Sequence, residues 1–248
     1  MTFYQSIKNI RAMKKRGTLL IIIILLFLVS ISLNGCSLYN RLFGEPEPQT
    51  PGALMEKGME SMASGYYQSA IDAFEKIKDR YPYSKYAIVA ELKLADALFG
   101  KGSYDEAYDA YDEFERLHPT NPKIPYVIYQ KGMCHFKQIG SIDRDQSHTI
   151  KAKEEFQRLI KRFPDNTYAR LAHKRLRDCY IELAEHELYV GKFYYRIKKY
   201  KAAKGRFLYI LHNYPDLGQY HEALKYLGLC EEKLAEQKAK KAAKQAKK

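Results

Sequence analysis

The sequence predicts an all-α fold, a helical-repeat solenoid of about five units with one long central helix. Two observations predict it. A phrase of aromatic, alanine, aromatic and proline residues recurs four times with the same internal spacing, and a small residue precedes most copies at a fixed distance. No segment shows the strict alternation of apolar and polar residues that is typical of a strand.

The repeated phrase begins with an aromatic residue, and an alanine stands three positions after it. A second aromatic residue stands four positions after the alanine, and a proline stands eight positions after the second aromatic residue. The copies are Tyr67, Ala70, Phe74, Pro82; Tyr104, Ala107, Tyr111, Pro119; Thr149 in place of the first aromatic, then Ala152, Phe156, Pro164; and Tyr200, Ala203, Phe207, Pro215. This is tetratricopeptide-like spacing, in which each unit is a pair of helices. The proline is expected to end the second helix.

The first helix of each pair should carry a small residue twelve positions before the alanine, where it lets the two helices approach closely. The residues in that position are Gly58, Ala95 and Gly191. In the third unit the small residue is Gly132, which stands twenty positions before Ala152. That unit therefore has eight inserted residues, which we place in a polar loop over residues 140–149.

A long helix is predicted after the third proline. Asn166 or Thr167 can cap it, and no proline or glycine interrupts it before Gly191, so it should continue to about Lys198 and separate two halves of the array. The first half covers residues 53–166 and the second half covers residues 167–237.

A last helix from Gln219 to about Lys238 has no second helix after it and should cap the array. Residues 238–248 form a tail rich in lysine and alanine, which is typical of a fraying helix or a disordered end. Weak attraction of this tail to anionic head groups is the alternative.

The beginning of the chain predicts export and lipid attachment. Five basic residues and no acid precede an apolar run from Leu19 to Leu33. This run is shorter than the roughly 20 residues that a membrane-spanning helix needs, so residues 1–35 are interpreted as a signal peptide. Leu33-Asn34-Gly35-Cys36 resembles a lipobox, in which Cys36 is lipidated. A plain signal peptide or an uncleaved anchor with a chance cysteine is the alternative.

The proline-rich end of residues 36–52 predicts a tether between the lipid and the folded part.

The formal charge of +13 is concentrated at the two ends of the chain. With the leader and the lysine tail set aside, 31 basic residues face 29 acidic ones. A surface that follows nucleic-acid phosphates needs clustered basic side chains, so we expect no nucleic-acid partner.

Cysteine and histidine usage argues against catalysis. If Cys36 carries lipid, three cysteines remain: Cys134, Cys179 and Cys230. Because each lies in a helical pattern, buried thiols are expected, and one disulfide pair stays open as an alternative. The seven histidines are scattered, and His186 lacks the second histidine that a helical zinc site requires. We therefore expect no enzyme, no metal and no cofactor other than the covalent lipid.

Taken together, the lipobox, the tether and the repeats resemble the BamD family, the tetratricopeptide lipoproteins of the outer-membrane β-barrel assembly machinery. The phrases that carry the likeness are residues 80–87, 117–122 and 126–132, the loop Asp143-Arg144-Asp145 before Ala152, the long helix over 169–195, and Tyr214-Pro215-Asp216. The resemblance covers nearly the whole chain after the leader, except the lysine tail.

The resemblance implies a binding scaffold held by its lipid on the periplasmic face of the outer membrane. Its implied partners are the barrel-embedded assembly protein with its accessory lipoproteins, and unfolded outer-membrane protein precursors that it helps to insert. Ser37 is consistent with outer-membrane sorting, because aspartate at that position is the familiar inner-membrane signal. The alternative is another periplasmic repeat lipoprotein that coordinates cell-wall or envelope constriction factors.

A concave peptide groove is expected on the first helices of the first three units, one position beyond the packing residues. The candidate groove residues are Met55, Met59, Met62, Leu92, Phe99, Tyr126, Tyr129, Met133 and Phe136. Methionine and aromatic side chains suit varied peptides with an apolar or aromatic end, which barrel precursors commonly have. The alternative is that these side chains pack the solenoid interior or meet the tether.

The second half offers a candidate docking face, because its arginines lie among aromatic residues and both types favour interface centres. Arg206 matches a family arginine associated with contact to the assembly partner, so the resemblance implies a docking role for it. A solvated arginine is the alternative.

Overall fold

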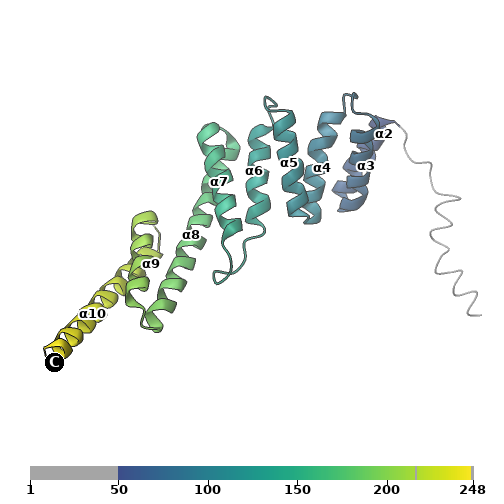
Figure 1. The fold of residues 1–248 in the computed structure, drawn as a ribbon. Helices are drawn as coiled ribbons and strands as arrows, with labels where there is room; N and C mark the ends of the chain where they lie inside the picture. Colours follow the sequence, from purple (N-terminus) through teal and green to yellow (C-terminus); the bar gives the residue numbers. More distant parts are fainter. Residues whose placement is uncertain (1–49, 216, 247–248) are drawn as a thin grey trace, which may run out of the picture. The chain divides into compact units, whose positions relative to one another are not determined.

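The computed structural model describes residues 50–215 and 217–246, and all regular structure within them is helical (Figure 1). The helices are α2 (Pro51–Ala63), α3 (Tyr67–Arg80), α4 (Ala87–Lys101), α5 (Tyr104–Leu117), α6 (Ile124–Phe136), α7 (Ser147–Arg162), α8 (Thr167–Arg196), α9 (Tyr200–Asn213) and α10 (Gln219–Gln245). The predicted signal peptide, the lipidation site Cys36 and the tether up to residue 49 lie outside the described residues. From Thr50 onward the chain forms one compact unit.

Helices that are neighbours in sequence are neighbours in space (Figure 1). The helix α2 packs against α3, α4 against α5, α6 against α7, and α8 against α9, and each pair packs against the next. The helix α10 lies against α9 and α8 and has no second helix after it within the described residues. Four pairs and a single last helix confirm the predicted all-α array of about five tetratricopeptide-like units.

Glycine and phenylalanine meet inside three of the pairs, as the repeat spacing predicts. A β-carbon built on the glycine would lie only 2.5–2.6 Å from the Cε1 atom of the facing ring. The three contacts join Gly58 to Phe74, Gly132 to Phe156 and Gly191 to Phe207. Because all three rings are fully buried, the missing β-carbon is what lets each ring lie against the backbone of the partner helix.

Each second helix ends two residues before the proline of its phrase. The last helical residues are Arg80, Leu117, Arg162 and Asn213. The residue between helix and proline leaves the helical conformation, with φ between −127° and −139° in all four cases. Proline causes this ending, because its ring disfavours helical backbone in the residue before it.

Three element boundaries differ from the predicted ones. The helix α2 begins at Pro51 rather than Ala53, because proline fits the first helical turn and the Thr50 hydroxyl accepts a hydrogen bond from the Ala53 amide at 3.3 Å. The helix α7 begins at Ser147, so the inserted loop spans residues 137–146. The last helix continues to Gln245 and includes most of the lysine tail.

The long helix α8 runs from Thr167 to Arg196, close to its predicted extent, and Asn166 caps it through a 2.9 Å bond from the Tyr168 amide. Its first half contributes Ala169 and Cys179 to the central core formed with α4 to α7. Its second half contributes Leu183 and Leu188 to the core formed with α9 and α10. The boundary between the two cores therefore lies within α8. The predicted boundary between the two halves lies before the first residue of α8.

A buried ion cluster joins α5, α6 and α7. The ammonium of Lys131, whose side chain is 5% exposed, lies 2.5 Å from Asp112, 3.2 Å from Glu115 and 3.6 Å from Glu155. The guanidinium of Arg158 contacts Glu115 and Glu155, each at 2.6 Å. Since both glutamates are largely buried, these contacts compensate for their lost hydration.

The three cysteines of the described residues are free and buried, as predicted. Burial raises the pKa of the Cys134 and Cys179 thiols to about 12, so both stay protonated at neutral pH. They act as small apolar core residues.

Candidate functional site

The nine predicted groove residues lie on α2, α4 and α6 and fall into two groups. Met55 and Met62 pack against the core of the first pair, and Met59 is 43% exposed. The other six belong to the central core or pack against it: Leu92, Phe99, Tyr126, Tyr129, Met133 and Phe136. The structure thus assigns Met55 and Met62 of α2 and the aromatic residues of α6 to different core clusters, and Met59 to neither.

A hollow of about 350 Å³ lies between α4, the start of α6 and the start of α8. Its apolar wall is made by Ile88, Val89, Leu92, Phe114, Tyr126 and Tyr168. Ile88 and Val89 are 45% and 49% exposed, so the apolar wall reaches the surface on α4. Polar groups of Lys93, Asp96, Asn121 and Lys123 complete the lining. Two predicted groove residues, Leu92 and Tyr126, therefore share one hollow.

A hydrogen-bond network holds the ring of Tyr126 in this wall. The hydroxyls of Tyr126 and Tyr111 both donate to Oδ1 of Asp96, at 2.6 and 2.7 Å, and the Lys93 ammonium lies 2.8 Å from Oδ2. Burial and the negative charge of Asp96 raise the pKa of Tyr126 far above its usual value, so its hydroxyl remains a donor. The wall is therefore preorganised, and its aromatic ring needs no ordering when a ligand binds.

The remaining aromatic residues of α6 pack against α7 and α8. The ring of Tyr168 lies 5.3 Å from that of Tyr126 and 5.7 Å from that of Tyr129, between centroids. Phe136 lies under the guanidinium of Arg175, 5.1 Å from ring centroid to Cζ. Tyr129 thus supports the aromatic wall through Tyr168, whereas Phe136 packs away from the hollow, against Arg175 and Phe156. Phe99 packs on Tyr104 of its own pair, with centroids 5.3 Å apart.

Sequence reasoning missed Ile88, Val89 and Tyr168 as lining residues. Ile88 precedes Leu92 by four positions, so helical spacing alone would have placed both on one face. Tyr168 gave no such signal. The repeat pattern marks the packed face of α8 only at Gly191, which lies far from Tyr168 along the same helix.

Arg206 lies on α9 with its side chain 43% exposed. Its Nη1 atom donates to both carboxylate oxygens of Glu187 on α8, at 3.0 Å each. Glu187 lines a second hollow of about 390 Å³ between the inserted loop, α7, α8 and α9. Nδ1 of His186 lies 2.6 Å from the Ile142 carbonyl oxygen, a contact that ties the loop to α8.

Two kinds of feature are not found in the described part of the chain. No helix there is both long and apolar enough to cross a bilayer. No group of three His, Cys, Asp or Glu side chains there could hold a metal ion.

Comparison with known proteins gives a consistent set of relatives. The chain is similar to "Outer membrane protein assembly factor BamD" of Rickettsia prowazekii, with 32% identity over 171 residues, 69% of this chain and 68% of that protein. The protein of the same name from Caulobacter vibrioides is 29% identical over 171 residues, 69% of this chain but only 56% of its own length. The chain thus spans little more than half of that relative.

Solved structures resemble the chain more loosely. The first tetratricopeptide domain of Spaghetti (RPAP3) bound to an HSP90 peptide has a TM-score of 0.42 at 24% identity and covers 55% of this chain and 94% of that one. A likeness at this level adds nothing to the assignment.

The family itself follows from the sequence match over most of the chain. Residues 48–246 match the model of the YfiO family, described as outer membrane lipoprotein. The curated relatives are named as assembly factors and not as enzymes, in agreement with the expectation of binding without catalysis. The chain belongs to this outer membrane lipoprotein family, together with the BamD assembly factors.

Proposed function

We propose that the chain is a lipid-anchored scaffold of the β-barrel assembly machinery on the periplasmic face of the outer membrane. In this role Cys36 carries the lipid, and the array binds unfolded β-barrel precursors and helps to insert them. Its partners are the barrel-embedded assembly protein and its accessory lipoproteins. Membership of the outer membrane lipoprotein family and the names of the relatives support this proposal.

The observation that carries the proposal is the preorganised hollow between α4, α6 and α8. Its volume of about 350 Å³ is at the small end of ligand sites, which suits one large side chain rather than a whole cofactor. Aliphatic and aromatic walls favour an apolar or aromatic residue of a precursor. Lys93 is paired with Asp96, so Lys123 in the lining supplies the positive charge for a peptide carboxylate.

The mechanism is binding through fixed side chains. Because Tyr126 is held by Asp96 before any ligand arrives, ordering the site costs little, and the affinity comes from buried apolar area. Such a site holds many sequences that share one apolar residue, which fits a scaffold that serves many precursors.

Crosslinking tests the hollow. A photoreactive peptide ending in an aromatic residue should label the wild-type chain near α4, and Val89→Asp should weaken labelling because a charge enters the apolar wall. Leu224→Asp is the matched control, since Leu224 has the same 49% exposure on α10. Equal labelling of the two variants would overturn the assignment of this hollow.

Co-purification tests the role in the assembly machinery. The lipoprotein would be isolated from gently solubilised envelopes and its companions identified by mass spectrometry. A barrel-embedded assembly protein in near-stoichiometric yield is expected. Recovery of cell-wall enzymes without that protein would instead favour the alternative scaffold of envelope constriction.

A further inference from the structure

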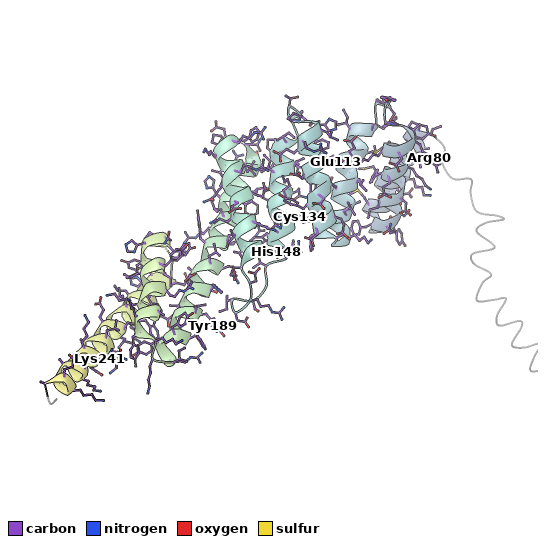
Figure 2. All side chains as sticks on the ribbon, viewed as in Figure 1. Arg80, Glu113, Cys134, His148, Tyr189 and Lys241 are labelled. Atoms are coloured by element: carbon purple, nitrogen blue, oxygen red, sulfur yellow. The ribbon has the colours of Figure 1, made fainter. Side chains whose placement is uncertain are left out.

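The last part of α10 extends beyond the other helices. Cys230 is the last buried residue of the helix, and every residue from Ala235 to Ala246 is exposed. Figure 2 shows Lys241 on this extension, with side chains projecting to solvent. The extension therefore keeps its helical form without tertiary packing.

Local chemistry explains why the extension is helical. Alanine and lysine are among the best helix formers, and lysines in the last turns interact favourably with the negative end of the helix dipole. The Lys233 ammonium also pairs with Glu236 at 2.8 Å. Stability alone, however, does not dictate on which side of the helix the lysines lie.

Most of the lysines and alanines lie on opposite sides of the extension. The lysine stripe, spaced i, i+7, i+11 with one neighbour, consists of Lys233, Lys240, Lys241 and Lys244. The alanine stripe, spaced i, i+4, i+7, i+11, consists of Ala235, Ala239, Ala242 and Ala246. At 100° per residue the centres of the two stripes are about 170° apart. Lys238 lies outside the stripe, about 120° from its centre, so most but not all of the positive charge is on one face.

Lys233 is paired with Glu236, but the other three lysines of the stripe have no direct ion pair. No carboxylate of the described residues lies within 4 Å of the ammonium groups of Lys240, Lys241 or Lys244. No acidic residue follows Glu236 in the sequence. The chain between the leader and the tail is nearly neutral, so the tail is the main source of a positive field on the mature chain.

We propose that the lysine stripe of α10 rests on an anionic phospholipid surface and gives the chain a second membrane contact besides its lipid. Charge complementarity supports a phosphate-bearing surface, because clustered lysines are attracted to anionic head groups within a Debye length. The inference rests on the proposed membrane location of the chain, which its outer membrane lipoprotein family supports and which brings such a surface within reach.

A lipid surface fits the stripe better than an acidic protein does. Protein interfaces are depleted in lysine and depend on arginine and aromatic anchors. Residues 235–246 contain only alanine, lysine, glutamine and one glutamate, and so they offer no such anchor. The alanine face carries too little apolar surface to enter the bilayer. The helix therefore lies on the head groups, and its binding is electrostatic.

Vesicle co-sedimentation tests the proposal on residues 50–248, which form a compact unit with its own cores and carry no lipid. The test variant replaces Lys240, Lys241 and Lys244 by glutamine, which preserves helix propensity. The control variant replaces three exposed lysines on other helices by glutamine: Lys161, Lys174 and Lys201. Both variants lose the same charge, and circular dichroism verifies that both remain folded.

The wild-type unit and the control are expected to bind vesicles of phosphatidylethanolamine and phosphatidylglycerol at low salt. The stripe variant should bind on the order of a hundredfold more weakly, and high salt should release the wild-type unit. None should bind phosphatidylcholine vesicles.

Three results would overturn the proposal. The first is that the wild-type unit does not bind anionic vesicles. This result would overturn the proposal even if the unit bound an acidic polypeptide. The second is equal loss in both variants, and the third is binding that survives high salt. The outcome is independent of precursor binding, because the peptide crosslinking test uses a different surface.

Discussion

The ring of Phe156 occupies the space that a β-carbon on Gly132 would need. An ideal β-carbon there would lie 2.5 Å from Cε1 of the ring, and the ring is fully buried. Close approach of α6 and α7 at this point therefore depends on glycine.

Gly132→Ala should destabilise the chain by about 1–3 kcal/mol, because the buried ring must move to admit a methyl group. Gly228→Ala in α10 is the control. Apart from the local backbone of its own helix, no atom lies within 4 Å of its added β-carbon, so alanine should stabilise the helix by about 0.5–1 kcal/mol. Urea unfolding measures both, and a Gly132→Ala variant as stable as wild type would contradict the packing.

Lys131→Met should cost about 3 kcal/mol, because it removes the ammonium from two largely buried glutamates. Arg158 would remain beside both glutamates, and the more exposed Arg162 beside Glu115 alone. The exposed pair of Lys78 and Glu113 gives the comparison, since its side chains are 35% and 41% exposed. Lys78→Met should change the unfolding free energy by less than about 1 kcal/mol. Similar losses in the two variants would show that burial of the cluster is not what matters.

Acid should weaken the same cluster. Burial alone would raise the pKa of Glu115, but the hydrogen bonds and charges of Arg158 and Lys131 outweigh it and hold the pKa below the usual 4.5. The folded state thus binds fewer protons than the unfolded state around that pH. The stability that Glu115 contributes is present above pH 4.5 and is lost as the pH falls through the lower folded pKa.

Unfolding free energies measured between neutral and acid pH check this sign. The Glu115→Gln variant lacks the titrating group, so its stability should fall less steeply below pH 4.5 than that of wild type. An identical acid slope in the two proteins would exclude Glu115 as a source of the pH dependence.

The docking role proposed for Arg206 can be separated from its ion pair. Arg206→Glu should reduce co-purification of the barrel-embedded partner several-fold, since it places like charges side by side and removes the exposed cation. Glu187→Gln also breaks the ion pair but leaves the guanidinium in place, so partner recovery should persist. If both variants lose the partner equally, the ion pair supports the fold and Arg206 does not contact the partner.

The repeat spacing predicted the fold well because local rules determine it. Glycines such as Gly191 fix which faces of paired helices meet, and prolines such as Pro119 fix where helices end. The length of α10 was underestimated, because its lysine and alanine residues favour a helix by propensity alone and bury no apolar face. The predicted end at Lys238 followed the apolar pattern instead.

The candidate site was less predictable because it joins residues from several helices. Leu92 and Tyr126 were found from helical spacing, but Tyr168 reaches the hollow only through the way in which α8 packs on α6. The buried position of Lys131 was also hidden, since lysine on a helix usually signals a solvated face. Such arrangements depend on contacts between units, which single-helix periodicity does not encode.

The helix α8 belongs to two cores and so acts as a lever arm between them. Its 30 residues give a rod about 45 Å long at 1.5 Å per residue. Tyr168 in its first turn lines the hollow, while Glu187, about two thirds of the way along the helix, pairs with Arg206. Tilting this rod by about 5° about its first turn would displace its far end by roughly 4 Å. The hollow lined by Tyr168 and the surface around Arg206 are therefore connected by one continuous helix, so a change in its tilt would alter their separation.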